Sequence, residues 1–445
     1  MALDAPSQLL SRDYTSVWHP YGRDSDHEAL LPITHGAGAL LFTEDGRAII
    51  DAISSWWVNL HGHAHPALTE AIARQSTLLS QAIFGSCTHE PAVTLAERLL
   101  ALLPANHQCV FYSDDGSTAV EVALKLAMQY WHNNHTPRTR FLALEGAYHG
   151  DTFGAMSVSE RGVFTNSFGE LLFSVDLLPF PGEPSAEDSC LAALDAALRN
   201  EPVAALIVEP LVQGAAGMRM YRPEILDEMI ARVRSAGALV IFDEVMTGFG
   251  RTGHLFACQQ TLHQPDLICL SKGITGGILP LGVTTMTGAI REACRTEDPN
   301  KTFFHGHSFT GNALSCACAL ASLDLLLSPA CTAARERITE RHAAFLDYLR
   351  RNYPTVASRH HGTILAVDFP HEVPTGYIHP LRHYLLREFL SDDILLRPLG
   401  NTVYVIPPYC ITDEQLYRIY ESMKRVLAIL SGSAPFPLAN KQISA

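Results

Sequence analysis

The strongest constraint on the fold is a series of short runs that are apolar at every position. They occupy residues 109–112, 141–144, 204–208, 238–242 and 267–270, with longer helix-like stretches between them. Strands without polar alternation are typical of a parallel sheet that is covered by helices on both faces. One intervening stretch begins at Pro223 and ends near Gly237, as expected of a helix. The sequence therefore predicts an α/β fold with a mostly parallel, doubly wound sheet.

The two ends of the chain follow a different pattern. Residues 1–60 are rich in loops, and residues 326–445 predict helices followed by strands near 364–367 and 403–406. We therefore expect a large domain at residues 61–325 and a smaller α+β domain assembled from the two ends.

Composition argues against several classes of function. The formal net charge is −14 and no run of Lys or Arg interrupts it, so we expect no binding to nucleic acid or to anionic lipid. The longest apolar stretch, 316–327, contains Ser322 and Asp324, so no membrane span is expected. Charged residues make up 18% of the chain, below the roughly 25% of typical domains, which indicates an oligomer interface.

Cysteine usage indicates a reducing compartment. The ten cysteines include no CxxC pair and are scattered through a long chain, which is typical of free thiols. The first residues carry acids early and lack the apolar core of a signal peptide. These features predict a cytoplasmic protein.

Polar residues with distinct chemistry follow the predicted strands. Gly116 and Ser117 follow the first run, Tyr148 the second, and Asp243 and Lys272 the last two. Ligands of doubly wound sheets bind beyond the carboxyl ends of the strands. We therefore expect these residues to face one crevice.

The helix that begins near Gly116 suits a phosphate, because the first N–H groups of a helix have no partner within it. Thr118 and Glu121 have the spacing of a capping box, so an ordinary capped helix is the alternative. Asp114 and Asp115 stand close by and would repel a phosphate, so we expect them to point away or to be compensated.

Lys272 and Asp243 indicate a specific chemistry. A lysine that follows a buried strand is removed from water, which lowers its pKa and makes its amine reactive toward carbonyl groups. Asp243 ends the neighbouring run, where a carboxylate can hold the protonated nitrogen of a pyridine ring. It could equally cap a helix or pair with Arg251.

Two further motifs suggest functions that we do not favour. Residues 248–253 match the GxGxxG pattern of dinucleotide sites, but the glycines open no clear helix and carboxylates stand nearby. His61, His63 and His65 alternate and could bind zinc, but the residues between them indicate a turn and no acid or thiol completes the set. We therefore expect neither a nicotinamide dehydrogenase nor a metal site, and a non-enzymatic binding protein is a further alternative.

Taken together, the motifs resemble those of a known enzyme family. They include SSWWVNLHGHAHP (54–66), DDGSTAVEVALKLAMQYW (114–131), YHGDTFGAMSV (148–158), DEVMTGFGRTGHLFAC (243–258), SKGITGG (271–277), HGHSFTGN (305–312) and LLRPLGNTVYVIPPY (395–409). From about residue 18 to 409 the chain is similar to the class III, fold type I aminotransferases, which use pyridoxal 5′-phosphate (PLP). The Trp-Trp pair and the last motif resemble the branch that aminates 8-amino-7-oxononanoate in biotin biosynthesis.

The resemblance implies a cofactor site within a homodimer. The residues implied to hold PLP are Gly116, Ser117, Tyr148, Asp243, Lys272, His307 and Ser308. Lys272 would be the catalytic residue, which bonds to PLP and moves a proton, and Asp243 would hold the ring nitrogen. Gly116 and Ser117 would hold the phosphate, and Ser308 would reach a phosphate in the partner subunit.

The resemblance also implies two substrates. The acceptor would be 8-amino-7-oxononanoate, which becomes 7,8-diaminononanoate, and the donor would be S-adenosylmethionine or, as in some relatives, lysine. The residues implied to contact substrate are Tyr21, Trp56, Trp57, Tyr148, Gly306 and Arg397. Arg397 would pair with the acceptor's carboxylate, the alternative being an internal pair with a glutamate. A class III aminotransferase for another ω-amino acid or a diamine is the alternative function.

The sequence departs from the family pattern near the donor pocket. His307 and Ser308 stand where Pro and Thr are usual, and Met246 and Thr247 stand where smaller residues are common. These departures bear on the shape of the pocket more than on the chemistry.

Overall fold

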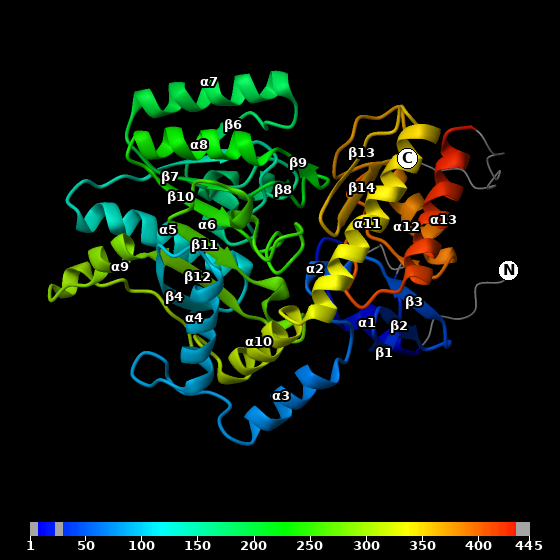
Figure 1. Ribbon diagram of the computed structural model, residues 1–445, viewed down its shortest axis with the longest axis horizontal. Helices are drawn as coiled ribbons and strands as arrows, with labels where there is room; N and C mark the ends of the chain where they lie inside the picture. The colour runs from blue at the N-terminus through cyan, green and yellow to red at the C-terminus, as the bar shows by residue number, and fades with distance from the viewer. Residues whose placement is uncertain (1–7, 23–29, 433–445) are drawn as a thin grey trace.

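The computed structural model describes residues 8–22 and 30–432, and a seven-stranded sheet forms its larger part (Figure 1). The strands lie in the order β4 (His107–Ser113), β12 (Gly282–Thr287), β11 (Leu267–Leu270), β10 (Leu239–Asp243), β7 (Val203–Val208), β5 (Arg140–Leu144) and β6 (Val175–Leu178). β12 is antiparallel to both of its neighbours, and the other pairs are parallel. The prediction of an α/β fold with a mostly parallel sheet is confirmed.

Both faces of the sheet are covered, which explains the continuous apolar runs. In β7, Leu206 and Val208 belong to one buried cluster, while Ala205 and Ile207 belong to another on the opposite face. The first cluster includes residues of α4 (Glu90–Leu102), α7 (Pro184–Asn200) and α8 (Pro223–Ser235). The second includes residues of α5 (Gly116–Asn133), α6 (Phe153–Ser157) and α9 (Gly288–Cys294). The helix predicted from Pro223 to near Gly237 is α8.

The ends of the chain form two smaller sheets beside the large one (Figure 1). One contains β1 (Ile33–Ala37), β2 (Leu40–Thr43), β3 (Ala48–Asp51) and β15 (Ile394–Leu395), and the other contains β13 (Ser358–His361), β14 (Ile364–Asp368) and β16 (Thr402–Val405). The remaining elements are α1 (Gln8–Ser16), α2 (Ser54–Trp57), α3 (Pro66–Ser76), β8 (Val212–Gln213), β9 (Arg219–Met220), α10 (Ala313–Leu326), α11 (Pro329–Asn352), α12 (Leu381–Ser391) and α13 (Asp413–Leu430). The predicted boundaries at residues 60 and 325 stay a prediction.

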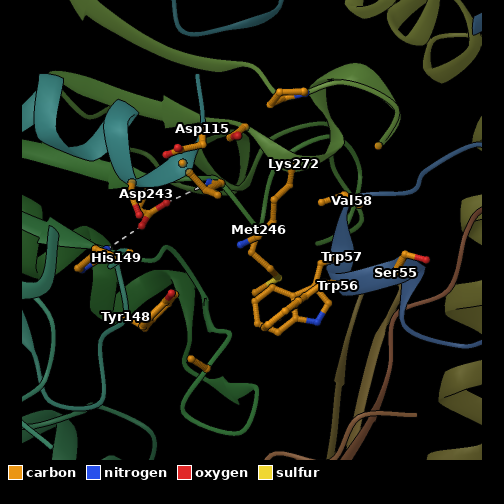
Figure 2. Close-up of a pocket in the computed structure, with 18 of the residues that line it drawn as sticks. Ser55, Trp56, Trp57, Val58, Asp115, Tyr148, His149, Asp243, Met246 and Lys272 are labelled. Atoms are coloured by element: carbon orange, nitrogen blue, oxygen red, sulfur yellow. Dashed lines mark hydrogen bonds and ion pairs between the residues drawn. The ribbon is translucent and has the colours of Figure 1, made fainter. Parts of the chain in front are cut away.

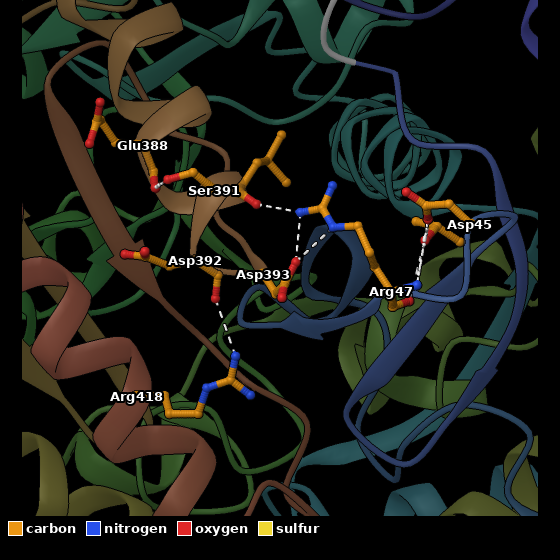
Figure 3. Close-up of polar contacts among 9 residues, drawn as sticks. Asp45, Arg47, Glu388, Ser391, Asp392, Asp393 and Arg418 are labelled. Carbon is orange, nitrogen blue, oxygen red and sulfur yellow. Dashed lines mark hydrogen bonds and ion pairs between the residues drawn. The ribbon is translucent and has the colours of Figure 1, made fainter. Parts of the chain in front are cut away.

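Strand pairing and a side-chain bridge join the two ends of the chain. β3 pairs in parallel with β15, although more than 340 residues separate them. Arg47 donates two hydrogen bonds to Oδ1 of Asp393, at 2.8 and 2.6 Å, and another to the Leu390 carbonyl (Figure 3). Arg418, which belongs to α13, donates to the Asp392 carbonyl at the end of α12. The contacts of Arg47 hold the N-terminal strands beside α12.

Two local predictions were wrong or incomplete. The capping box at Thr118 and Glu121 is wrong, because α5 already begins at Gly116 and Asp115 is its N-cap, accepting a hydrogen bond from the Thr118 N–H at 2.8 Å. Glu121 instead accepts bonds from the Thr152 hydroxyl and the Gly154 N–H. The strand β12 was not predicted, because its sequence GVTTMT is half threonine and lacks the fully apolar pattern.

α10 and α11 lie end to end with a bend of 68° between them. α10 packs against α3 and α4, and most of its residues are buried. Within residues 8–22 and 30–432, no single helix is long and apolar enough to cross a membrane. In the same residues, this bent pair is the one combination whose length and apolar composition would suffice for a span.

Candidate active site

Four neighbouring strands end at the same edge of the large sheet, and a polar residue stands at the end of each strand or shortly after it. Lys272 follows β11, Asp243 ends β10, Glu209 follows β7 and Tyr148 follows β5. All four line one cavity of about 620 Å³. In Figure 2, His149, Tyr148 and Asp243 lie on one side of this cavity and the Trp56–Trp57 pair on the other.

Lys272 extends into this cavity from a strained turn. Its φ angle is 44°, in the left-handed region, and it opens the short helix Lys272–Thr275. The amine Nζ lies 4.7 Å from the centroid of the Trp57 ring. Removal from water lowers the pKa of Lys272, against the opposing effect of the negative charges of Asp243 and Glu209. The lysine is thereby shifted toward its neutral, nucleophilic form.

Asp243 has a histidine as its partner rather than the Arg251 considered above. Its Oδ2 lies 2.7 Å from Nδ1 of His149, and its Oδ1 accepts the Val245 N–H at 3.1 Å. Both side chains are buried. No role was predicted for His149, although its position directly after Tyr148 at the same sheet edge was an available signal.

Glu209 is a second buried carboxylate at this edge, and sequence analysis missed it. Its two oxygens accept the N–H groups of Tyr148 and Gly214, at 3.1 and 2.8 Å. Burial raises the pKa of Glu209 to about 7, and the charge of Asp243 adds to the rise. The signal was present in the sequence, since Glu209 follows the apolar run 204–208 as Asp243 follows 238–242.

The N-terminus of α5 forms the end of the cavity that suits a phosphate. A Cβ atom at Gly116 would meet the side chain of Val245 at 2.7 Å, and one at Gly150 (φ +127°) would clash with Ser117. Ser117 Oγ accepts the Asp151 N–H at 3.0 Å. Asp115, which also lines the cavity, is occupied as the N-cap.

Trp56 and Trp57 stand on a left-handed turn. Ser54, Ser55, Trp56 and Trp57 have φ angles of 52°, 45°, 76° and 73°. This conformation costs about 1 to 2 kcal/mol per residue for L-amino acids, so the surrounding contacts must hold it in place. Such strain is found most often at functional sites.

Tyr21 and Tyr148 form a hydrogen-bonded group with Asp151. Their hydroxyl oxygens lie 2.8 Å apart, Tyr148 donates to Asp151 Oδ2 at 3.0 Å, and Tyr21 donates to the same oxygen. Burial raises the pKa of both phenols above its ordinary value. The ring of Tyr21 also meets the ring of Trp56, with 5.2 Å between centroids.

Arg397 lines the same cavity as Lys272 and is half-buried. Its guanidinium carbon is 4.6 Å from the centroid of the Trp56 ring. Among residues 8–22 and 30–432, no acid forms an ion pair with it. An unpaired guanidinium facing a cavity suits an anionic ligand.

Gly306, His307 and Ser308 do not line the cavity of their own chain. His307 Nδ1 accepts the Phe309 N–H and lies 3.2 Å from Oδ2 of Asp114, which lines the cavity, and the Ser308 carbonyl accepts a bond from Gln81 at 2.9 Å. Of the two larger residues near the donor pocket, Met246 lines the cavity and Thr247 is buried outside it.

The glycine and histidine motifs have structural partners. Residues 248–253 form a turn, and the Arg251 guanidinium donates to the carbonyls of Pro407, Trp57 and Asn59. His61 bonds to Ser322, His63 to Asp51, and His65 caps α3. In the part of the chain that the structure describes, no group of three or more His, Cys, Asp or Glu side chains could hold a metal ion.

Comparison with known proteins decides the family. The model of the class III aminotransferases matches residues 21–427. The chain belongs to this family. An adenosylmethionine-8-amino-7-oxononanoate aminotransferase from Synechococcus elongatus is 49% identical over 92% of the chain and 98% of the relative.

Solved structures of this family share the fold. The enzyme of the same name from Methanocaldococcus jannaschii has a TM-score of 0.88 at 31% identity, covering 94% of this chain and 98% of its own. An amine transaminase from an uncultivated Pseudomonas species, solved with PLP bound, has a TM-score of 0.87 at 30% identity, covering 92% and 98%. The two structures have different names but match the fold of this chain about equally well.

The residues of the cavity fit PLP. The cofactor needs an amine, a group for its ring nitrogen and a site for its phosphate, and a single cavity supplies Lys272, Asp243 and the start of α5. Nε2 of His149, which lines the cavity, is buried and has no hydrogen-bond partner in the part of the chain that the structure describes. At Gly116 and Gly150, Val245 and Ser117 pack so close to the backbone at the helix start that a Cβ atom would clash with them.

Proposed function

We propose that the chain transfers an amino group to 8-amino-7-oxononanoate, giving 7,8-diaminononanoate for biotin biosynthesis, with S-adenosylmethionine as the donor and PLP as the cofactor. The observation that carries the proposal is the position of Arg397, which faces the same cavity as Lys272 and has no acid partner among the described residues. The identity of 49% to a relative of that name supports the choice of substrates.

Within this proposal, Lys272 would bond to PLP, Asp243 would hold its ring nitrogen, Gly116 and Ser117 would hold its phosphate, and Tyr148 would contact its ring. Bound PLP supplies a carbonyl that bonds covalently to amines and a ring that takes up electrons when a proton leaves. Asp243 favours the protonated ring nitrogen, since a carboxylate stabilises a positive charge beside it. Once the substrate's amine had displaced Lys272 from PLP, the freed Nζ, whose pKa is lowered by burial, would remove a proton from the carbon that bears the substrate's amino group.

The opposite wall orients the substrates. Arg397 binds the carboxylate of the acceptor through paired N–H groups. Trp56, Trp57 and Tyr21 supply flat apolar surfaces for the alkyl chain of the acceptor and for the purine or sulfonium of the donor. Since the pKa of Tyr21 and of Tyr148 is raised, both phenols stay protonated and donate hydrogen bonds.

We propose further that the enzyme is a homodimer in which Gly306, His307 and Ser308 complete the partner's site. The surface around them supports this, because Phe304 is 76% exposed, Phe309 59% and Ile83 70%. Exposed apolar patches of this kind mark interaction surfaces. The ten free cysteines support a cytoplasmic location, and the domain limits 1–60, 61–325 and 326–445 are part of the same proposal.

The test follows the colour of the cofactor in each half-reaction. The yellow absorbance of the PLP-loaded enzyme is expected to bleach with S-adenosylmethionine and to return with 8-amino-7-oxononanoate. Bleaching by lysine but not by S-adenosylmethionine would overturn the proposed donor. The alternative class III activity would be favoured if the colour did not return with the oxononanoate but returned with the aldehyde that corresponds to an ω-amino acid.

A further inference from the structure

The HGHAHP segment at residues 61–66 has no role in the proposed reaction, yet one of its histidines is linked through Asp51 to Ser55, which lines the cavity. His63 donates from Nε2 to Oδ2 of Asp51 at 2.9 Å. The two neighbouring histidines differ, since His61 bonds to Ser322 and His65 accepts the Ala67 N–H. His63 is therefore the member of the motif that is linked to the tryptophan turn.

Asp51 is the centre of this link. Its side chain is fully buried at the end of β3. Oδ1 accepts the N–H groups of Ile53 and Ser55, at 3.3 and 2.9 Å, and Oδ2 accepts the Ser55 hydroxyl at 2.7 Å besides His63. A carboxylate has about four acceptor positions, so all of them are used. Three of the four bonds hold the chain where it enters the left-handed turn.

Ser55 transmits this restraint to the substrate site. Its φ angle is 45°, and Trp56 follows it directly with a φ angle of 76°. The face of Trp56 lies 4.6 Å from the guanidinium of Arg397, which has no acid partner among the described residues. Without the bonds to Ser55, the strained turn has a lower-energy conformation to relax into, and the ring that supports Arg397 would move with it.

We propose that Asp51 and His63 are positioning residues for the substrate carboxylate: they hold Ser55 in the left-handed conformation that places Trp56 beneath Arg397. Neither residue touches substrate. Their effect is on the direction of the guanidinium and hence on the preference of the site for an anionic acceptor. This inference rests on the proposed function, because the carboxylate in question is that of 8-amino-7-oxononanoate.

Selectivity between the acid and its methyl ester tests the inference, because the ester lacks the negative charge that Arg397 binds. We would measure kcat/KM of the holoenzyme for both compounds in Asp51→Asn and His63→Gln. Asp393→Asn is the matched acid control, since Asp393 directly precedes β15 of the same small sheet but pairs with Arg47. His65→Gln is the matched histidine control, since it acts at α3.

The preference for the acid is expected to fall about tenfold in Asp51→Asn and less in His63→Gln, and to stay within about twofold of wild type in both controls. A general loss of stability would lower both rates together and leave the ratio unchanged. If Asp51→Asn does not fold, Ser55→Ala removes only the hydroxyl bond and is expected to lower the ratio by a smaller factor. An unchanged ratio in a folded, active Asp51→Asn or Ser55→Ala would overturn the inference.

A second readout separates this inference from the proposed function. Near-ultraviolet circular dichroism reports the surroundings of the tryptophans without any turnover, and it is expected to change in Asp51→Asn but not in Asp393→Asn. If the wild type converts neither acid nor ester, the proposed function fails while this spectrum still reports on the turn. An unchanged spectrum in Asp51→Asn would overturn the positioning role whatever the activity.

Discussion

The two walls of the active-site cavity are built in opposite ways. The wall with Lys272, Asp243 and Glu209 consists of the ends of regular parallel strands, and its side chains point to one place because the strands are neighbours. The wall with Trp56 and Trp57 is a left-handed turn. Asp51 accepts the N–H of Ser55 in this turn, and Arg251, from a distant part of the chain, donates to the carbonyl of Trp57. In the proposed function, the sheet edge carries the chemistry, whereas the turn carries the contacts that select a substrate.

Removing the amine from the sheet edge has the largest expected effect. Lys272→Ala takes away the group that bonds to the cofactor and moves the proton, so kcat is expected to fall by about 10⁴-fold or more. Steady-state kinetics measures this loss. Lys301→Ala, which removes a lysine that bonds to the Asn133 carbonyl far from the cavity, should leave kcat unchanged. Equal losses in both variants would show that the assignment of Lys272 is wrong.

Asp243→Asn comes next. The amide keeps the shape of the side chain but loses the charge that favours a protonated ring nitrogen, so kcat is expected to fall by about 10² to 10³-fold while PLP still binds. Asp227→Asn, a matched change at an acid that accepts the N–H groups of Leu262 and His263, is the control. Near-normal turnover in Asp243→Asn would leave this carboxylate with a structural role only.

On the tryptophan wall, Arg397→Ala is expected to act on binding rather than on chemistry. The KM for 8-amino-7-oxononanoate should rise by about 30-fold, which corresponds to about 2 kcal/mol for a lost charge pair, with a smaller change in kcat. The KM of Arg397→Lys should lie between those of wild type and Arg397→Ala, because an ammonium keeps the charge but cannot form the paired hydrogen bonds. If kcat fell as much as in Asp243→Asn, the division of labour between the two walls would be contradicted.

The smallest expected effect concerns Glu209 and the pH dependence of stability. Burial raises its pKa from 4.5 to about 7, so the folded chain holds a proton that the unfolded chain releases. The stabilisation is fully present below about pH 4.5 and is lost as the pH rises through about 7. Denaturant unfolding at pH 5 and pH 8 should therefore show a smaller loss of stability in Glu209→Gln than in wild type. The same loss in both would mean that Glu209 is ionised in the folded chain throughout this range.

The same contrast explains what could be predicted from the sequence. The strands at the sheet edge are apolar runs, so their ends, and with them Asp243 and Lys272, could be located from local pattern and the rule for doubly wound sheets. The left-handed turn could not, because no local signal in SSWW favours positive φ angles, which here depend on Asp51, Arg251 and the strands around them. The His149–Asp243 pair was not predicted either, because the pattern brings His149 to the sheet edge after Tyr148 but does not show which way its side chain points.

The most direct test of the whole account is identification of the product. Purified enzyme loaded with PLP would be given 8-amino-7-oxononanoate and S-adenosylmethionine, and the product would be analysed by mass spectrometry. The account predicts 7,8-diaminononanoate from wild type, with none above background from Lys272→Ala. Absence of this product from wild type with S-adenosylmethionine and with lysine, in enzyme whose PLP is bound at Lys272, would contradict it.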